Sequence, residues 1–126
     1  MFLSPLLDDP QGPWILQNVR TGAVLAWRLE VAFDSETRRR GLLGRQGLLG
    51  GSAMIIAPCS SIHTFFMRFP IDVVFAERDG RVIKVYHELP AWRVGFGWKG
   101  FAAIELPAGT LAPSETRPGD LLQIAR

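Results

Sequence analysis

The chain has 126 residues, of which 48% are hydrophobic and 21% charged, and its formal net charge is +2. This length suits one domain, and this composition is typical of a globular protein rather than a disordered or fibrous one. The near balance of charges is weak support for nucleic-acid binding, and the single cysteine, Cys59, excludes an intramolecular disulfide and a cysteine-rich metal site.

The N-terminal stretch and the hydropathy of the chain favour a cytoplasmic protein. The first residues lack the positively charged start and the unbroken apolar run of a signal peptide. No segment approaches the roughly 18 apolar residues of a membrane-spanning helix. We therefore expect a cytoplasmic protein that does not span a membrane and does not bind nucleic acid.

The first part of the chain predicts an arm followed by β structure. Residues 1–13 contain three prolines and two adjacent aspartates, which indicate an irregular arm before one β domain at residues 14–126. Residues 14–18 can form a strand. Residues 25–33 alternate between larger apolar residues and small or charged ones, which predicts a longer strand whose odd-numbered residues face the core.

A short helix and a buried strand are expected next. Asp34 or Ser35 offers a side-chain oxygen to the free amides of a helix that carries Arg38, Arg39 and Arg40 on its exposed side. Glycines then interrupt the helix. The fully apolar run at residues 53–57 is stopped by a proline and predicts a buried strand.

A hairpin dominates the stretch from residue 60 to residue 89. Short strands are expected at residues 62–67 and 71–77, and Asp79 with Gly80 is a pair that two-residue hairpin turns prefer, which predicts an antiparallel partner at residues 81–89. The segment at residues 92–101 mixes tryptophan and phenylalanine with glycine and fits no repeat period, so we expect a long loop or an irregular edge.

The end of the chain completes a mainly β pattern. Residues 102–106 and 121–125 are expected to be strands, with room for one helical turn between them. Seven or eight short strands with one or two short helices predict a single-domain antiparallel β sandwich or partly closed barrel.

The order of these segments resembles the bacterial and archaeal family called domain of unknown function 192, from about residue 27 to residue 124. The stretches that carry the resemblance are ETRRRGLLGR, IHTFFMRFPIDVVFAERDGRVIKV, AAIELPAG and RPGDLLQI. The matching positions are Arg38, Gly41, Leu42, Leu43, Arg45, Phe66, Met67, Pro70, Ile71, Asp72, Glu105, Gly119 and Asp120. The chain departs by having Leu43 where methionine is common, Phe66 where tryptophan is common and Phe69 where asparagine is usual. The resemblance implies a compact β fold and no particular activity.

The leading functional hypothesis is a binding or accessory domain rather than an enzyme, with no cofactor and no bound metal. Asp72 lies among apolar strand residues, so its carboxylate needs a donor or a cation if it is buried. A structural pair with Arg38 or Arg45 is one interpretation. The other is a cleft for a small polar ligand, such as a sugar or a peptide segment. Its expected lining is His63, Thr64, Met67, Asp72 and Glu105, bordered by Arg38, Arg45 and Trp92.

Two alternatives remain open. Cys59 and His63 are four residues apart, and a thiolate beside an imidazole can be the nucleophile of a small hydrolase or transferase, although their spacing spans a turn. The same hydrolase or transferase could instead use a carboxylate-bound metal, with His63, His87, Asp72 and Glu105 as candidate ligands, although these residues lack any recognised ligand spacing. The aromatic segment at residues 92–101 could instead contact a ligand or a protein partner.

Overall fold

The computed structural model describes all residues, 1–126, and it is mainly β with three short helices and no closed barrel. Its elements are α1 (Ser4–Asp8), β1 (Ile15–Asn18), β2 (Val24–Ala26), β3 (Arg28–Ala32), α2 (Ser35–Arg40), β4 (Ser52–Ile56), β5 (Ser61–His63), β6 (Ile71–Ala76), β7 (Val82–Leu89), β8 (Val94–Phe96), β9 (Ala102–Pro107), α3 (Leu111–Ser114) and β10 (Leu122–Ala125). No helix is long and apolar enough to cross a bilayer.

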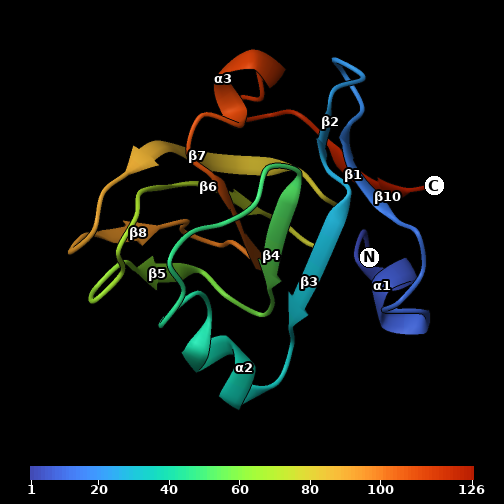
Figure 1. The fold of residues 1–126 in the computed structure, drawn as a ribbon. Helices are drawn as coiled ribbons and strands as arrows, with labels where there is room; N and C mark the ends of the chain where they lie inside the picture. The colour runs from blue at the N-terminus through green and yellow to red at the C-terminus, as the bar shows by residue number, and fades with distance from the viewer.

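A five-stranded sheet in the order β3-β4-β9-β6-β7 lies at the centre (Figure 1). Every residue of β4 and β6 is buried, as are all residues of β9 except the last. A strand that is buried along its whole length has cover on both faces of its sheet. The mainly β fold was predicted correctly, as was the buried strand at residues 53–57.

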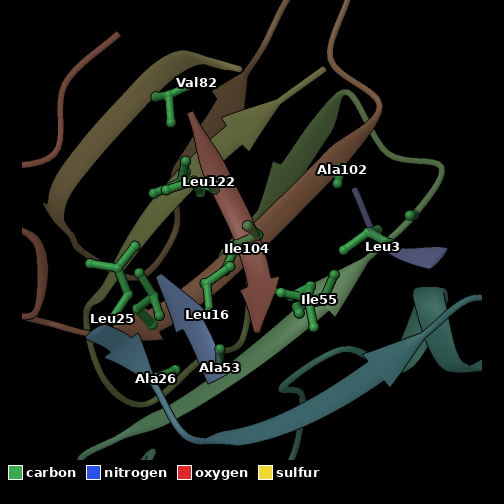
Figure 2. Packing of buried hydrophobic residues seen from close by; sticks show 14 of the residues in the cluster. Leu3, Leu16, Leu25, Ala26, Ala53, Ile55, Val82, Ala102, Ile104 and Leu122 are labelled. Atoms are coloured by element: carbon green, nitrogen blue, oxygen red, sulfur yellow. The ribbon is translucent and has the colours of Figure 1, made fainter. Parts of the chain in front are cut away.

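One face of this sheet packs against a smaller sheet, β10-β1-β2, and against α1. Figure 2 shows Ile55 and Ile104 of the central sheet beside Leu16 and Leu122 of the smaller one. This cluster contains 16 buried residues and forms the larger of the two cores. The two layers have the architecture of a β sandwich.

The other face is covered by the turn that follows α2 and by a two-stranded ribbon of β5 and β8. A second core of 10 buried residues lies there, including Met54, Val73, Phe75 and Ala103 from the central strands. Because successive residues of a strand point to opposite faces, the register of the central strands decides which side chains reach each core.

The arm expected at residues 1–13 is not irregular throughout. Ser4–Asp8 forms α1, with a proline in its first turn, where the missing amide costs nothing. Leu3 and Leu6 are fully buried in the larger core, and the amide of Phe2 donates to the carbonyl of Arg78. The first proline marks the start of a helix, and the apolar residues before and after it hold the segment against the sheet.

The single strand expected at residues 25–33 is two strands in different sheets. β2 pairs with β1, whereas β3 runs parallel to β4, so the sheet is not purely antiparallel. The break falls at Trp27, which is 56% exposed, and its ring covers Gly51 so closely that a Cβ there would lie 2.3 Å from it. The expected inward direction of all odd-numbered residues was therefore wrong at Trp27. The parallel pairing follows from the α2 crossover between β3 and β4.

The hairpin between β6 and β7 was predicted correctly, but its turn is a different one. The amide of Gly80 donates to the carbonyl of Glu77, and Gly80 has φ +94° whereas Asp79 is not in the left-handed region. The loop therefore needs one left-handed residue rather than two. The strand expected at residues 62–67 is limited to β5, because Phe66 has φ +65° and turns the chain.

Candidate functional site

A pocket of about 350 Å³ lies between α2 with its following turn on one side and β5 on the other. In Figure 1, α2 lies below the β5–β8 ribbon. The face of the central sheet that carries the smaller core closes the space between them. Its volume is in the range of small-molecule sites. The lining residues are Ser35, Arg38, Arg39, Arg40, Gly41, Leu42, Leu43, Ile56, Pro58, Cys59, Ser61, Ile62, His63, Met67 and Glu105.

Glu105 is the buried acid of this pocket. It lies in β9 in register with Met54 on one side and Val73 on the other, so it shares an apolar sheet face with them. The residue is 3% exposed, and no protein group donates a hydrogen bond to its carboxylate. Burial raises the pKa of Glu105 to about 7, against the smaller opposing attraction of Arg45. A carboxyl group in such surroundings is ready to accept a donor from a ligand.

Arg45 does not satisfy this carboxyl group, because it is engaged elsewhere. Its two terminal nitrogens donate to the carboxylate oxygens of Glu30 at 2.8 and 2.7 Å. Glu30 is in register with Met54 and lies on the same sheet face as Glu105. The bidentate pair fixes the guanidinium beside the pocket without placing it in the lining.

The mouth of the pocket is basic. Asp34 caps α2 by accepting a hydrogen bond from the amide of Thr37 at 2.8 Å, as expected from the sequence. This cap sets the helix so that Arg38 donates to the carbonyl of Pro58 across the pocket edge at 3.1 Å. Arg39 and Arg40 complete a cationic rim. The site therefore combines a buried acid, apolar walls and a positively charged opening.

Cys59 and His63 line the same pocket but do not form a nucleophile pair. The thiol of Cys59 donates to the carbonyl of Ser61 at 3.0 Å, and burial raises its pKa. His63 accepts a hydrogen bond at Nδ1 from the amide of Phe65, and no hydrogen bond joins it to the sulfur. A protonated thiol bonded to a carbonyl is a poor nucleophile.

Asp72 lies away from the pocket, and its expected pairing with Arg38 or Arg45 is wrong. It is fully buried and in register with Leu106, so it shares the face of the larger core. Its carboxylate accepts hydrogen bonds from the amides of Glu88 and Leu111, both at 2.8 Å. Asp72 therefore fastens β7 and α3 to β6, and it does not meet Glu105, which lies on the opposite face.

Thr64 and Trp92 also lie outside the pocket. The hydroxyl of Thr64 donates to the carbonyl of Pro90 at 2.6 Å and accepts from the amide of Arg93 at 2.9 Å, which ties down the loop before β8. Trp92 is 56% exposed and packs on Phe65 and Phe66. Of the eight expected site residues, the pocket brings together Arg38, His63, Met67 and Glu105 and leaves out Arg45, Thr64, Asp72 and Trp92.

Several lining residues were not among those expected from the sequence. Leu42, Leu43 and Ile62 form the apolar wall, and Gly41 turns the chain away from α2 with φ +48°. A Cβ on Gly41 would lie 3.8 Å from Oε1 of Glu105. Leu42 and Leu43 could have been predicted to lie near the site, because apolar residues that follow an exposed arginine-rich helix pack against the sheet.

A second polar cluster holds the C-terminal end of the chain. Asp120 accepts hydrogen bonds from Arg20 at 2.6 and 3.0 Å, from Asn18 at 2.9 Å and from the amide of Arg117 at 3.0 Å. Hydrogen bonding from Arg20 is the main reason why the pKa of this carboxyl group lies well below its usual range. Asn18 and Thr116 are also buried there and are hydrogen-bonded to one another. The carboxylate of Asp120 is satisfied by donors of the protein, so the cluster is structural.

No group of three or more histidine, cysteine, aspartate or glutamate side chains gathers at a spacing that could hold a metal ion.

Comparisons with known proteins agree on the fold. The family model of domain of unknown function 192, DUF192, described as Uncharacterized ACR, matches residues 16–124. A crystal structure of a protein of unknown function from Novosphingobium aromaticivorans is similar with a TM-score of 0.73 and 22% identity, over 88% of this chain and 83% of that one. A structure titled as a putative transcription regulator from Sinorhizobium meliloti is similar with a TM-score of 0.75 and 20% identity, over 88% of this chain and 91% of that one. No curated protein is similar enough in sequence to count as a relative.

Proposed function

The chain belongs to the DUF192 family, whose function is unknown, and from its pocket we propose that it binds a small polar molecule through Glu105. The observation that carries this proposal is the carboxyl group of Glu105, which is 3% exposed and has no hydrogen-bond donor within the protein. No unpaired side-chain polar atom of the protein is fully enclosed, so the oxygens of this carboxyl group are open to the pocket. A largely buried acid that faces a pocket without a donor from the protein can take its hydrogen bond from a ligand.

The residues that line the pocket indicate which chemical groups the ligand should carry. Its inner end carries a hydrogen-bond donor, such as an ammonium, amide or hydroxyl group, to meet Glu105. Its middle is partly apolar, because Leu42, Leu43 and Ile62 form the walls. The basic rim at Arg38 to Arg40 favours a negatively charged outer end. Sugars, amino acids and short peptide segments are the classes that contain such molecules.

A thermal-shift screen of these three classes tests the proposal. A ligand at about 100 times its Kd stabilises the folded state by about 2.7 kcal/mol, which raises the Tm of a domain of this size by roughly 10 °C. We expect at least one class to shift the wild-type protein and to have no effect on Glu105→Leu, whose side chain suits the apolar face but cannot accept a hydrogen bond.

Glu36→Gln is the matched control, because Glu36 is exposed on α2 and does not line the pocket. It should respond to the ligand as the wild type does. A ligand that shifts Glu105→Leu as far as the wild type, or a screen without any shift, would contradict the proposal.

A further inference from the structure

The exposed face of the β5–β8 ribbon carries an aromatic strip that the pocket does not use. Trp92, Val94, Phe96 and Trp98 alternate along the chain and are 56, 42, 63 and 85% exposed. Phe66, at 73% exposed, packs on Trp92 with a ring separation of 4.7 Å. We call Phe66, Trp92, Val94, Phe96 and Trp98 the aromatic strip. Isolated apolar side chains on a surface are normal, but several that follow one another along one ribbon and its turns are typical of an interaction site.

The sequence pattern forces this strip outward. Gly95 and Gly97 occupy the alternate positions and are buried. A Cβ on Gly97 would lie 2.3 Å from the side chain of Phe75, and one on Gly95 would lie 3.2 Å from Tyr86. The ribbon therefore lies directly on the core, and its large side chains have only the solvent side available. The segment at residues 92–101 was expected to have no period, so this alternation is a correction.

Basic side chains that have no acidic partner border the strip. Arg68, Arg93 and Lys99 are exposed and form no salt bridge, whereas Arg20, Arg40, Arg45, Arg81 and Arg117 each lie within 4.0 Å of a carboxylate. Residues 57–70 and 89–101, which contain β5, β8 and the turns beside them, have no acid. Glu88 directly precedes the second segment, and Glu77 and Asp79 line a shallow hollow with Arg78 and Lys99, so the excess charge is clearest at Arg68 and Arg93. The strip thus combines aromatic side chains with an excess of positive charge.

At the centre of the strip, the main-chain amide and carbonyl of Phe96 are already hydrogen-bonded, so an additional strand cannot pair with them. The amide of Phe96 donates to the hydroxyl of Tyr86 at 2.9 Å, and that hydroxyl donates to the carbonyl of Phe96 at 3.2 Å. A protein partner would need hydrogen-bond partners at its interface, about one per 100–200 Å². The rings also pack on one another, at 30° for Phe65 with Trp92 and 60° for Phe66 with Trp92, which leaves fewer flat faces for bases or sugars to stack on.

We propose that the aromatic strip docks this protein onto the surface of a bilayer that contains anionic phospholipids. Tryptophan and phenylalanine side chains prefer the boundary between headgroups and acyl chains, and arginine and lysine beside them meet the phosphates. Neither contact requires an added strand to pair with the main chain of the strip. This binding is peripheral, and it is independent of the pocket.

Vesicle flotation tests the proposal with phosphatidylcholine alone and with phosphatidylcholine containing about one third phosphatidylglycerol. We expect the wild-type protein to float with the anionic vesicles, to be released by high salt, and to remain largely unbound with phosphatidylcholine alone. Tryptophan fluorescence should shift to the blue on binding. The double variant F96S/W98S should lose at least tenfold in affinity, because it removes the two most exposed rings of β8 and its turn.

Charge and location are tested by two further variants. R93Q/K99Q should weaken binding to the anionic vesicles about fivefold for each cation removed, at low salt. Trp27→Ser is the matched control, since Trp27 is 56% exposed like Trp92 but lies between β2 and β3, and its vesicle affinity should equal that of the wild type. Glu105→Leu should also bind vesicles normally, which separates this proposal from the pocket.

Three results would overturn it: no flotation with anionic vesicles, flotation that F96S/W98S does not reduce, or concentration-dependent self-association that F96S/W98S abolishes in the absence of any vesicle binding.

Discussion

Glu105 and Asp120 are both buried carboxyl groups, and their surroundings give them opposite properties. Asp120 receives hydrogen bonds from Arg20, Asn18 and the amide of Arg117, so its ionised form is stabilised and its pKa is lowered. Glu105 receives none, so its neutral form is stabilised and its pKa is raised to about 7. Asp120 therefore stabilises the folded state when it is ionised, whereas ionisation of Glu105 destabilises it.

Replacing Glu105 by glutamine should remove a pH dependence. The folded-state pKa of about 7 lies above the reference value of 4.5, so the folded protein binds more protons and its free energy of unfolding falls as pH rises from 4.5 to 7. The loss is about 3 kcal/mol for a shift of this size. Glu105→Gln should be flat over this range and more stable than the wild type at pH 8. Urea unfolding at several pH values measures it, and equal slopes for the two proteins would contradict the assignment.

Removing the carboxylate of Asp120 should lower the free energy of unfolding at neutral pH, whereas Glu105→Gln raises it. Asp120→Ala leaves the buried amide of Asn18 without one of its acceptors, which costs about 1–3 kcal/mol at neutral pH. Arg20 also loses its acceptor, but its side chain is 40% exposed and water can replace the carboxylate. Because the folded-state pKa is lowered, the stability from this acid is present above the reference value of 3.8 and is lost as pH falls below it. The cost of the substitution should therefore shrink in acid. Glu36→Ala, on the exposed face of α2, should cost less than about 0.5 kcal/mol in the same urea titration.

At the level of the elements, single side chains and glycines hold whole segments in place. Asp72 accepts the first amide of α3 and an amide of β7, so one carboxylate joins three elements. Gly97 lets the segment that follows β8 lie against Phe75. Neither feature belongs to the pocket, and each can be tested without disturbing Glu105.

Asp72→Ala should loosen α3 more than the rest of the fold. It leaves the amides of Glu88 and Leu111 without acceptors in a buried site, which costs about 2–4 kcal/mol in total. Hydrogen exchange should show lost protection at Leu111 and Glu88 first. Any ligand identified for the pocket should still bind, because Asp72 lies on the other face of the sheet. Lost binding in a protein that remains folded would place Asp72 in the site after all.

Gly97→Ala should destabilise the fold by about 2 kcal/mol or more. The added methyl group would overlap the side chain of Phe75, so either β8 or Phe75 must move. Gly47→Ala is the matched control, because nothing lies within 4 Å of its Cβ position and its φ is not positive. Thermal unfolding of the two variants should differ by several degrees. Equal melting temperatures would mean that the ribbon does not lie against the core.

The whole molecule is built on one sheet that both cores share. β4, β6 and β9 contribute alternate residues to the larger core on one face and to the pocket core on the other. Neither core can be lost without freeing the strands that carry the other. The fold should therefore unfold as one cooperative unit.

Leu6→Ala tests this cooperativity from the far end of the chain. Leu6 of α1 is fully buried in the larger core, and truncating a buried leucine costs about 2–5 kcal/mol. Circular dichroism and tryptophan fluorescence should report the same lowered urea midpoint. The fluorescence includes Trp92 and Trp98, which lie on the side of the smaller core. Two separate midpoints would contradict a shared unfolding unit, and an unchanged midpoint would contradict the packing of α1.

Much of the fold was visible in the sequence, and the site was visible in part. The cap at Asp34, the apolar run of β4 and the turn at Gly80 are local signals, and signals of this kind predict the mainly β fold. The family was predicted separately, from the resemblance of several short motifs in the right order. The offset between β6 and β9 is not local. It pairs Asp72 with Leu106 and Val73 with Glu105, and so it sends the two acids to opposite faces. A sequence alone does not state this register, and for this reason the expected cleft joined residues that never meet.

The glycines of the β5–β8 ribbon have a consequence for how this protein can change. Since Gly95 and Gly97 contribute the contact with the core, the exposed residues that alternate with them have almost no share in holding the fold together. Substitutions at Val94, Phe96 and Trp98 can therefore alter what the surface binds while the stability of the domain stays nearly constant. Such separation of binding from folding lets relatives diverge at this face, and it makes these three positions suitable for randomisation in a binder library.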